Sequence, residues 1–174
     1  MMFAAMPLKA ADVEEAITVL SATLKPAADD WVLNAALNVK LNRAQEDGLM
    51  KGIPLNFVTE AKLQRKRTWW FNEDIAAASR TGRLNYSTLT RRYQLETAEG
   101  FKAYDTLPEV LAVLGRVENW TIASGKNIKA GSTYVAALRM RLDVAQLSKP
   151  LQIKALGSAK WDVESDWHEW EVTP

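Results

Sequence analysis

The clearest periodic pattern in the chain lies at residues 31–41, which read WVLNAALNVKL. Every second side chain from Trp31 to Leu41 is apolar, and two Asn and one Lys are among the residues between them. A period of two places the apolar side chains on one face of a β-strand and the polar ones on the other. The preceding residues 17–24 are rich in β-branched side chains, and residues 25–30 have the composition of a turn. These stretches together predict a β-hairpin with one buried face.

Similar apolar runs recur along the rest of the chain, separated by turn residues. Two features in residues 81–96 predict interruptions of the strands. Thr81 and Gly82 have turn composition, and the run at 84–96 changes phase midway, which predicts a β-bulge. Further strands are predicted at residues 53–64, 84–96, 101–104, 120–123, 134–144, 151–156 and 161–172.

Two helices are predicted from their start signals. Asn42 and Gln45 form a capping-box pattern before residues 43–51, and Thr106 and Glu109 form another before residues 107–117. The expected fold class is mainly β (α+β), with about eight or nine strands in an antiparallel sheet or β-sandwich and these two helices.

Composition bounds the chemistry that the chain can perform. Its 174 residues suit one domain, which we place at residues 11–174. The chain has no Cys and a single His, which excludes disulfides, cysteine nucleophiles and multi-histidine metal sites. No glycine-rich phosphate loop is present. We therefore predict no catalytic residue, no metal site and no cofactor.

The first ten residues, MMFAAMPLKA, differ from the acidic stretch that follows them. An apolar run that ends in small residues is typical of a secretory signal peptide, although the basic start is missing here. We interpret residues 1–10 as the remnant of a signal peptide or as a disordered N-terminus, and we expect the mature chain in the periplasm. No stretch approaches the length of a membrane span.

The candidate binding residues lie in a basic segment, residues 60–92, which has eight basic and three acidic side chains. Aromatic residues are interleaved with the basic ones, as on surfaces that bind a partner or single-stranded nucleic acid. The acidic end, residues 158–174, has five acidic side chains and one Lys, so the two segments are also able to pair across a sheet. The net charge of +1 gives no general attraction to nucleic acid, and none is expected as a partner. The six residues selected as a partner-binding surface are Arg65, Arg67, Trp69, Trp70, Arg91 and Arg92.

Several long motifs resemble the DUF4390 family. They stand in one order over about residues 13–172: GIPLNF at 52–57, RKRTWWFNE at 65–73, LNYSTLTRRYQL at 84–95, LPEVLAVLGRVENW at 107–120, and residues 137–170 with RMRLDVAQLSKPLQIKAL at 139–156. The resemblance implies a small exported proteobacterial protein, often encoded near a nitrogen-regulation type sensor kinase, with no catalytic residues to carry over.

Taken together, the sequence predicts a non-enzymatic periplasmic binding or accessory domain. Its expected partner is another envelope protein, such as a sensor kinase. The alternatives are a small-ligand-binding protein, a hydrolase built on carboxylates alone, which needs two acids in one cleft, and a single-strand nucleic-acid binder through the basic segment.

Overall fold

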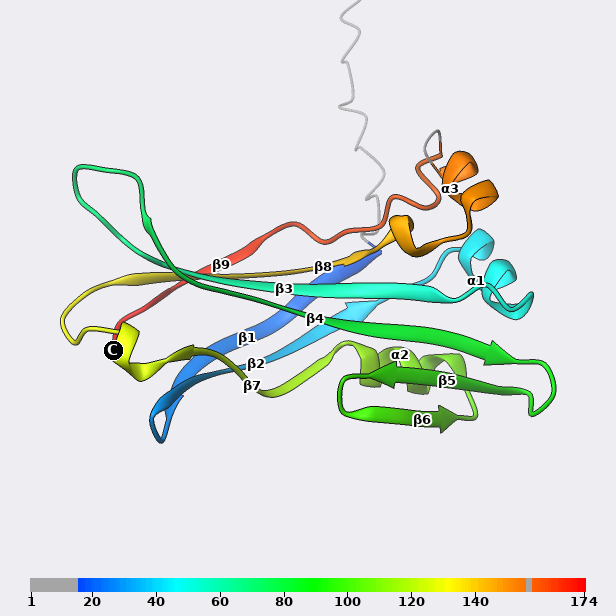
Figure 1. Cartoon of the computed structure of the whole chain (residues 1–174), viewed down its shortest axis with the longest axis horizontal. Helices are drawn as coiled ribbons and strands as arrows, with labels where there is room; N and C mark the ends of the chain where they lie inside the picture. The colour runs from blue at the N-terminus through cyan, green and yellow to red at the C-terminus, as the bar shows by residue number, and fades with distance from the viewer. Residues whose placement is uncertain (1–15, 156–157) are drawn as a thin grey trace, which may run out of the picture.

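The computed structural model describes residues 16–155 and 158–174, which form two antiparallel sheets (Figure 1). One sheet has the strand order β1-β2-β7 and the other the order β6-β5-β4-β3-β8-β9. The strands are β1 (Ile17–Ala27), β2 (Asp30–Val39), β3 (Leu55–Arg65), β4 (Glu73–Ser87), β5 (Arg92–Thr97), β6 (Gly100–Tyr104), β7 (Arg116–Ser124), β8 (Tyr134–Leu142) and β9 (His168–Val172). The helices in the described part are α1 (Arg43–Met50), α2 (Leu107–Leu114) and α3 (Lys149–Ala155), with short 3₁₀ turns at Gly125–Asn127 and Val144–Gln146. The predicted mainly β, antiparallel fold is confirmed.

Strand β2 is the centre of the smaller sheet, as its alternation indicates. It pairs with β1 on one side and β7 on the other. Leu33 and Leu37 are buried, and they belong to one cluster of buried side chains that also includes Phe57 of β3 and Leu138 of β8. The hydrophobic core therefore draws on both sheets.

The first two helices begin where their capping residues predict. The Asn42 side chain accepts a hydrogen bond from Gln45 N, and the Gln45 side chain accepts one from Asn42 N. At the start of α2, the Thr106 side chain accepts a hydrogen bond from Glu109 N. Helix α2 ends at Leu114, three residues earlier than expected, because Gly115 O accepts a hydrogen bond from Leu37 N and the chain continues as β7.

Two predictions around β4 are wrong, one of a turn and one of a β-bulge. Thr81 and Gly82 lie inside one continuous strand, where Gly82 leaves room for Leu114 of α2: a Cβ there would be 2.7 Å from Leu114 Cδ1. The phase change in residues 84–96 is a hairpin turn between β4 and β5, not a bulge, and Arg91 has a positive φ of 54° there.

The predicted strand at 151–156 is also wrong, since its described part belongs to helix α3. Pro150 in the first turn suits a helix start. The Gln152 side chain donates to Ala145 O and Leu147 O and so fixes the helix against the preceding turn.

The final strand is shorter than the predicted 161–172. Only His168–Val172 forms a ladder with β8, and Glu164 adds an isolated bridge to Arg141. Ser165 still pairs with Met140 through its backbone N–H and its hydroxyl, so the segment before β9 is extended along β8. The prediction for residues 1–10 lies outside the described residues.

Candidate functional site

A long hairpin made by β3 and β4 projects from the body of the domain (Figure 1). The last pair of its ladder is Arg65 with Glu73, and residues 66–72 connect the two strands beyond it. The hairpin is thus a continuation of two central strands of the larger sheet.

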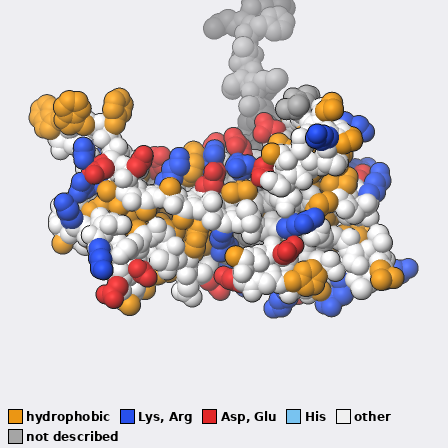
Figure 2. Space-filling view, viewed as in Figure 1, with side chains coloured by type: hydrophobic (Ala, Val, Ile, Leu, Met, Phe, Trp, Pro, Cys, Tyr) orange, Lys and Arg blue, Asp and Glu red, His pale blue; other side chains and the backbone are white. Residues whose placement is uncertain are grey.

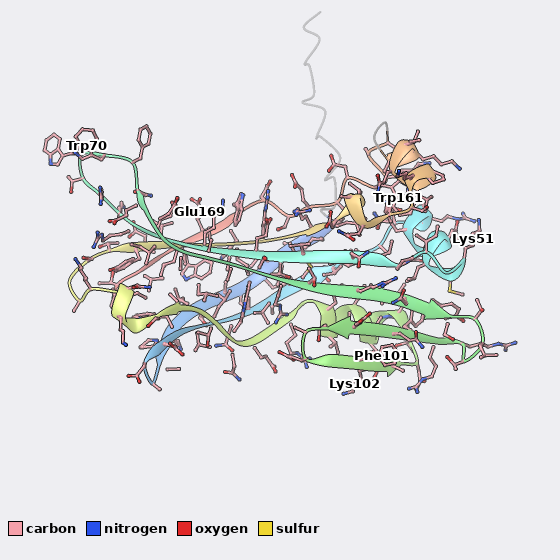
Figure 3. All side chains as sticks on the ribbon, viewed as in Figure 1. Lys51, Trp70, Phe101, Lys102, Trp161 and Glu169 are labelled. Carbon is pink, nitrogen blue, oxygen red and sulfur yellow. The ribbon has the colours of Figure 1, made fainter. Side chains whose placement is uncertain are left out.

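Three consecutive aromatic residues at the end of this hairpin are almost fully exposed. The exposed fractions are 88% for Trp69, 78% for Trp70 and 95% for Phe71. We call these three residues the aromatic tip. Figure 2 shows hydrophobic side chains gathered at this projection, and Figure 3 shows Trp70 pointing away from the body. Large apolar side chains are normally removed from water, so a contiguous exposed group of them indicates a contact surface.

The base of the hairpin is held by cross-strand polar contacts. Glu73 accepts hydrogen bonds from Arg65 and from Arg67, the latter at 2.7 Å, and the Gln64 side chain donates to Asp74 at 2.6 Å. The hydrogen bonds from Arg67 and Arg65 hold the pKa of the Glu73 carboxyl below its ordinary value. The Glu73 carboxyl is therefore stabilised in its charged form, and the two arginines help to hold the base of the hairpin together.

The basic segment meets the acidic end of the chain at this hairpin. The Lys66 ammonium lies 2.5 Å from a Glu171 carboxylate oxygen, and Lys66 N donates to Thr133 O at 2.9 Å. Further along β3, Lys62 lies over the Trp167 ring at 4.6 Å. The sequence allowed two roles for the basic segment, binding to a partner and pairing with the acidic end of the chain. The contacts of Lys66 and Lys62 are examples of the second role.

The six predicted site residues do not form one surface. Arg65, Arg67, Trp69 and Trp70 lie together at the hairpin end. Arg91 and Arg92 lie at the β4–β5 turn, at the opposite end of the 15-residue strand β4. At about 3.3 Å per residue, this strand separates the two groups by roughly 45 Å. Arg92 is engaged there by Asp105 at 2.8 Å.

Phe71 was not among the predicted site residues, although it is the most exposed member of the tip. The signal that points to it is the unbroken run of three aromatics before a polar turn, at positions 69–71.

A groove of about 760 Å³ lies between β4, β5, β6, α2 and β7. Its walls include Leu95, Leu114 and Tyr104, and its rim mixes acidic and basic side chains. Arg80 lies here, where its guanidinium donates to Arg116 O at 2.7 Å and stacks on Trp120 at 5.7 Å. Burial lowers the pKa of Arg80, and the charge of Glu99 opposes this. The Arg80 guanidinium thus lines the groove and is held in place by Arg116 O and the Trp120 ring.

The Domain of unknown function (DUF4390) family model matches residues 14–171. This match covers nearly all of the described residues. The chain belongs to the DUF4390 family. The resemblance seen in the sequence is thereby confirmed. No curated protein and no solved structure is similar enough to the chain to match it.

A second charged cluster of the DUF4390 domain joins β3 to β8. The Glu60 carboxylate lies 2.7 Å from Arg139 Nε and 3.5 Å from Arg141 Nε, and Arg139 also lies 3.7 Å from Glu164. The Arg139 guanidinium covers the Trp167 ring at 4.6 Å. Partial burial raises the pKa of the Glu60 carboxyl, but the hydrogen bond and charge of Arg139, with those of Arg141, lower it below its ordinary value.

This cluster predicts a pH-dependent contribution to stability. Because the pKa of Glu60 is lowered in the folded chain, the stability that it contributes is present above the unfolded pKa of about 4.3 and is lost as the pH falls through the folded pKa. We expect Glu60→Gln to lower the free energy of unfolding by about 1 kcal/mol at neutral pH after allowing for solvent screening. Urea denaturation over a pH series checks this. A difference between the two proteins that stays constant down to about pH 3 contradicts an ionic origin.

In residues 16–155 and 158–174, no group of three or more His, Cys, Asp or Glu side chains is placed to hold a metal ion. His168 is exposed and lies beside Trp170, with 5.6 Å between the ring centroids. Among the same described residues, no helix of the DUF4390 domain is long and apolar enough to cross a membrane.

Proposed function

We propose that this DUF4390 domain is a non-enzymatic accessory module of the bacterial periplasm, which docks on another component of the envelope through its aromatic tip. The observation that carries the proposal is the exposure of Trp69, Trp70 and Phe71 at the end of a projecting hairpin. None of the three belongs to the hydrophobic core. Their apolar surface is thus available for a contact outside the domain.

The residue types also support docking. Trp is enriched among the side chains that dominate binding energy, because a large apolar ring is combined with one hydrogen-bond donor. The cross-strand contacts of Glu73 fix the hairpin before a partner arrives, which limits the entropy lost on binding. A periplasmic location and a sensor-kinase system as the setting follow from the family resemblance and belong to the proposal.

The groove supports a different function less well. Glu99 and Glu118 both line it, so the two acids that a carboxylate-based hydrolase requires have a place in the structure. Both residues are exposed, however, whereas the acid and base of such a hydrolase work in a cleft that holds them against the substrate. The aromatic tip is the stronger observation.

The docking proposal predicts that envelope binding depends on the tip. Purified protein is mixed with envelope membranes of the source bacterium, and the bound fraction is measured by sedimentation. We expect the triple variant Trp69→Ala, Trp70→Ala, Phe71→Ala to bind at least about tenfold more weakly than the wild type, because the tip loses most of its exposed apolar area.

Leu89→Ala is the matched control. Leu89 is also an exposed apolar residue in a hairpin turn, but it lies at the other end of β4. We expect this variant to bind like the wild type. Equal binding by the triple variant and the wild type would remove the proposal.

A further inference from the structure

We infer that the envelope component contacted by the aromatic tip is the lipid–water interface of a membrane that contains anionic phospholipid. This inference rests on the proposed docking function and names its partner. It is carried by the chemistry of the tip, its small contact area, the charges behind it and the rigidity of its base.

The side chains of the tip are those that favour the interfacial layer of a bilayer. Trp69 and Trp70 each combine a large apolar ring with one N–H, which suits a position between acyl chains and headgroups. Phe71 has no polar group and is the most exposed of the three, at 95%. The tip thus offers two interfacial anchors and one fully apolar side chain.

The contact area of the tip is small for a specific protein interface. Three aromatic side chains present about 600 Å² between them, whereas a stable protein complex buries about 800 Å² on each partner and needs matching shape. The residues that adjoin the tip, Thr68 and Asn72, are polar, and Lys66 and Arg67 before them are charged, so the apolar patch does not widen toward the body. A bilayer accepts a narrow apolar projection without a complementary pocket.

Cationic side chains lie in the hairpin loop beside the tip and in a stretch of chain that is bound to the hairpin base. Arg67 comes from the hairpin itself. Lys126 and Lys129 come from residues 125–133, a stretch bound to the hairpin base by the hydrogen bond from Lys66 N to Thr133 O. Both lysines are exposed, and neither has an ion-pair partner among the described residues. Such cations attract anionic headgroups.

Part of this positive charge is already neutralised. Arg67 pairs with Glu73, and Lys66 pairs with Glu171. The electrostatic part of binding is therefore expected to be moderate, with aromatic insertion as the main source of affinity. Anionic lipid and low salt should strengthen binding without being the sole cause of it.

The hairpin reaches the interface already ordered. The ladder of β3 with β4 runs continuously from Leu55 to Leu63 and, after one irregularity, to Arg65. The charged base limits how far the tip enters, so the expected depth is about 5–10 Å, as for other interfacial anchors. This is peripheral attachment by three side chains.

Protein-free vesicles test the inference. The full chain is mixed with vesicles of phosphatidylethanolamine and phosphatidylglycerol, and separately with phosphatidylcholine vesicles, and binding is measured by sedimentation. We expect the wild type to bind, more tightly to the anionic vesicles, and the triple alanine variant to lose about a hundredfold in partition coefficient. Leu89→Ala is the control, and every variant keeps the same residues 1–15, so the difference reports on the tip.

Insertion is measured separately by quenching of Trp fluorescence with lipids brominated along the acyl chain. We expect quenching in the wild type that disappears in the double variant Trp69→Phe, Trp70→Phe, which should still bind more tightly than the triple alanine variant. The thermal midpoints of all variants are compared with that of the wild type to establish that each is folded.

The outcomes separate this inference from the proposed function. If binding to native envelopes depends on the tip but binding to protein-free vesicles is absent, the tip contacts a protein, and only the lipid inference is overturned. Vesicle binding that is equal in the wild type and the triple variant also overturns it. If neither envelopes nor vesicles show dependence on the tip, both proposals fail.

Discussion

Replacing Tyr134 with alanine is expected to lower the free energy of unfolding by about 4 kcal/mol, because it leaves a cavity the size of an aromatic ring in the core. Tyr134 is the largest side chain among those that are fully buried, with 1% of its surface exposed. It begins β8 and pairs with Arg65 on one side and Val172 on the other. The loss is measured by urea denaturation of the variant and the wild type.

Tyr134→Phe is the matched control. It keeps the ring and removes only the hydroxyl, which accepts a hydrogen bond from Lys129 N at 2.7 Å. We expect a loss of about 1 kcal/mol from this variant. Equal losses in the two variants would place the stabilisation in the hydrogen bond instead of in packing. Lys129 belongs to the stretch beside the hairpin base, so we also expect Tyr134→Phe to weaken vesicle binding slightly. The loss should be smaller than that of the triple tip variant.

Gly115→Ala is the second substitution with a large expected effect. A Cβ at this position would lie 2.1 Å from Leu37 O and 3.1 Å from Leu37 C, both of them backbone atoms. The φ of Gly115 is −77°, so crowding and not backbone conformation is the cause. Since β2 and β7 must move apart to admit the methyl group, we expect a loss of about 3 kcal/mol. Thermal and urea denaturation both measure it.

Gly48→Ala provides the comparison, since it makes the same chemical change inside α1. Its new Cβ would meet side chains only, Trp161 at 3.2 Å and Ile53 at 3.3 Å. Such atoms are able to shift, and Ala favours a helix over Gly by about 1 kcal/mol, so we expect a net change within about 1 kcal/mol. A Gly115→Ala protein as stable as Gly48→Ala would show that β2 and β7 have more freedom than the structure indicates.

The fold was most predictable where burial is one-sided and where caps are present. The alternation of β2 and the capping box at Asn42 both led to the observed elements. The failures arose where one local signal has two meanings. Gly82 suggested a turn, whereas it is needed because Leu114 packs over it from a helix more than thirty residues later in the chain. Residues 151–155 are too few for their period to separate strand from helix, and Gln152 decides through contacts with the preceding turn.

The part of the candidate site at the hairpin end could be predicted from the sequence. Trp69 and Trp70, with Arg65 and Arg67, were found because aromatic and basic residues adjoin in the sequence. The prediction that these residues share one surface with Arg91 and Arg92 was wrong. Composition does not reveal that the long strand β4 runs without a turn between the two groups. Which arginines are engaged by carboxylates likewise depends on the register of the sheet.

The flanks of the aromatic tip have a consequence for self-association in solution. Exposed aromatic runs promote aggregation, and charged residues placed directly beside such runs oppose it. Here Lys66 and Arg67 precede the tip, and Glu73 and Asp74 follow it. Two copies that met tip to tip would have to remove water from these charged side chains, which is unfavourable. The hairpin therefore keeps the proposed docking surface exposed to water, while its charged flanks limit the attraction between identical molecules.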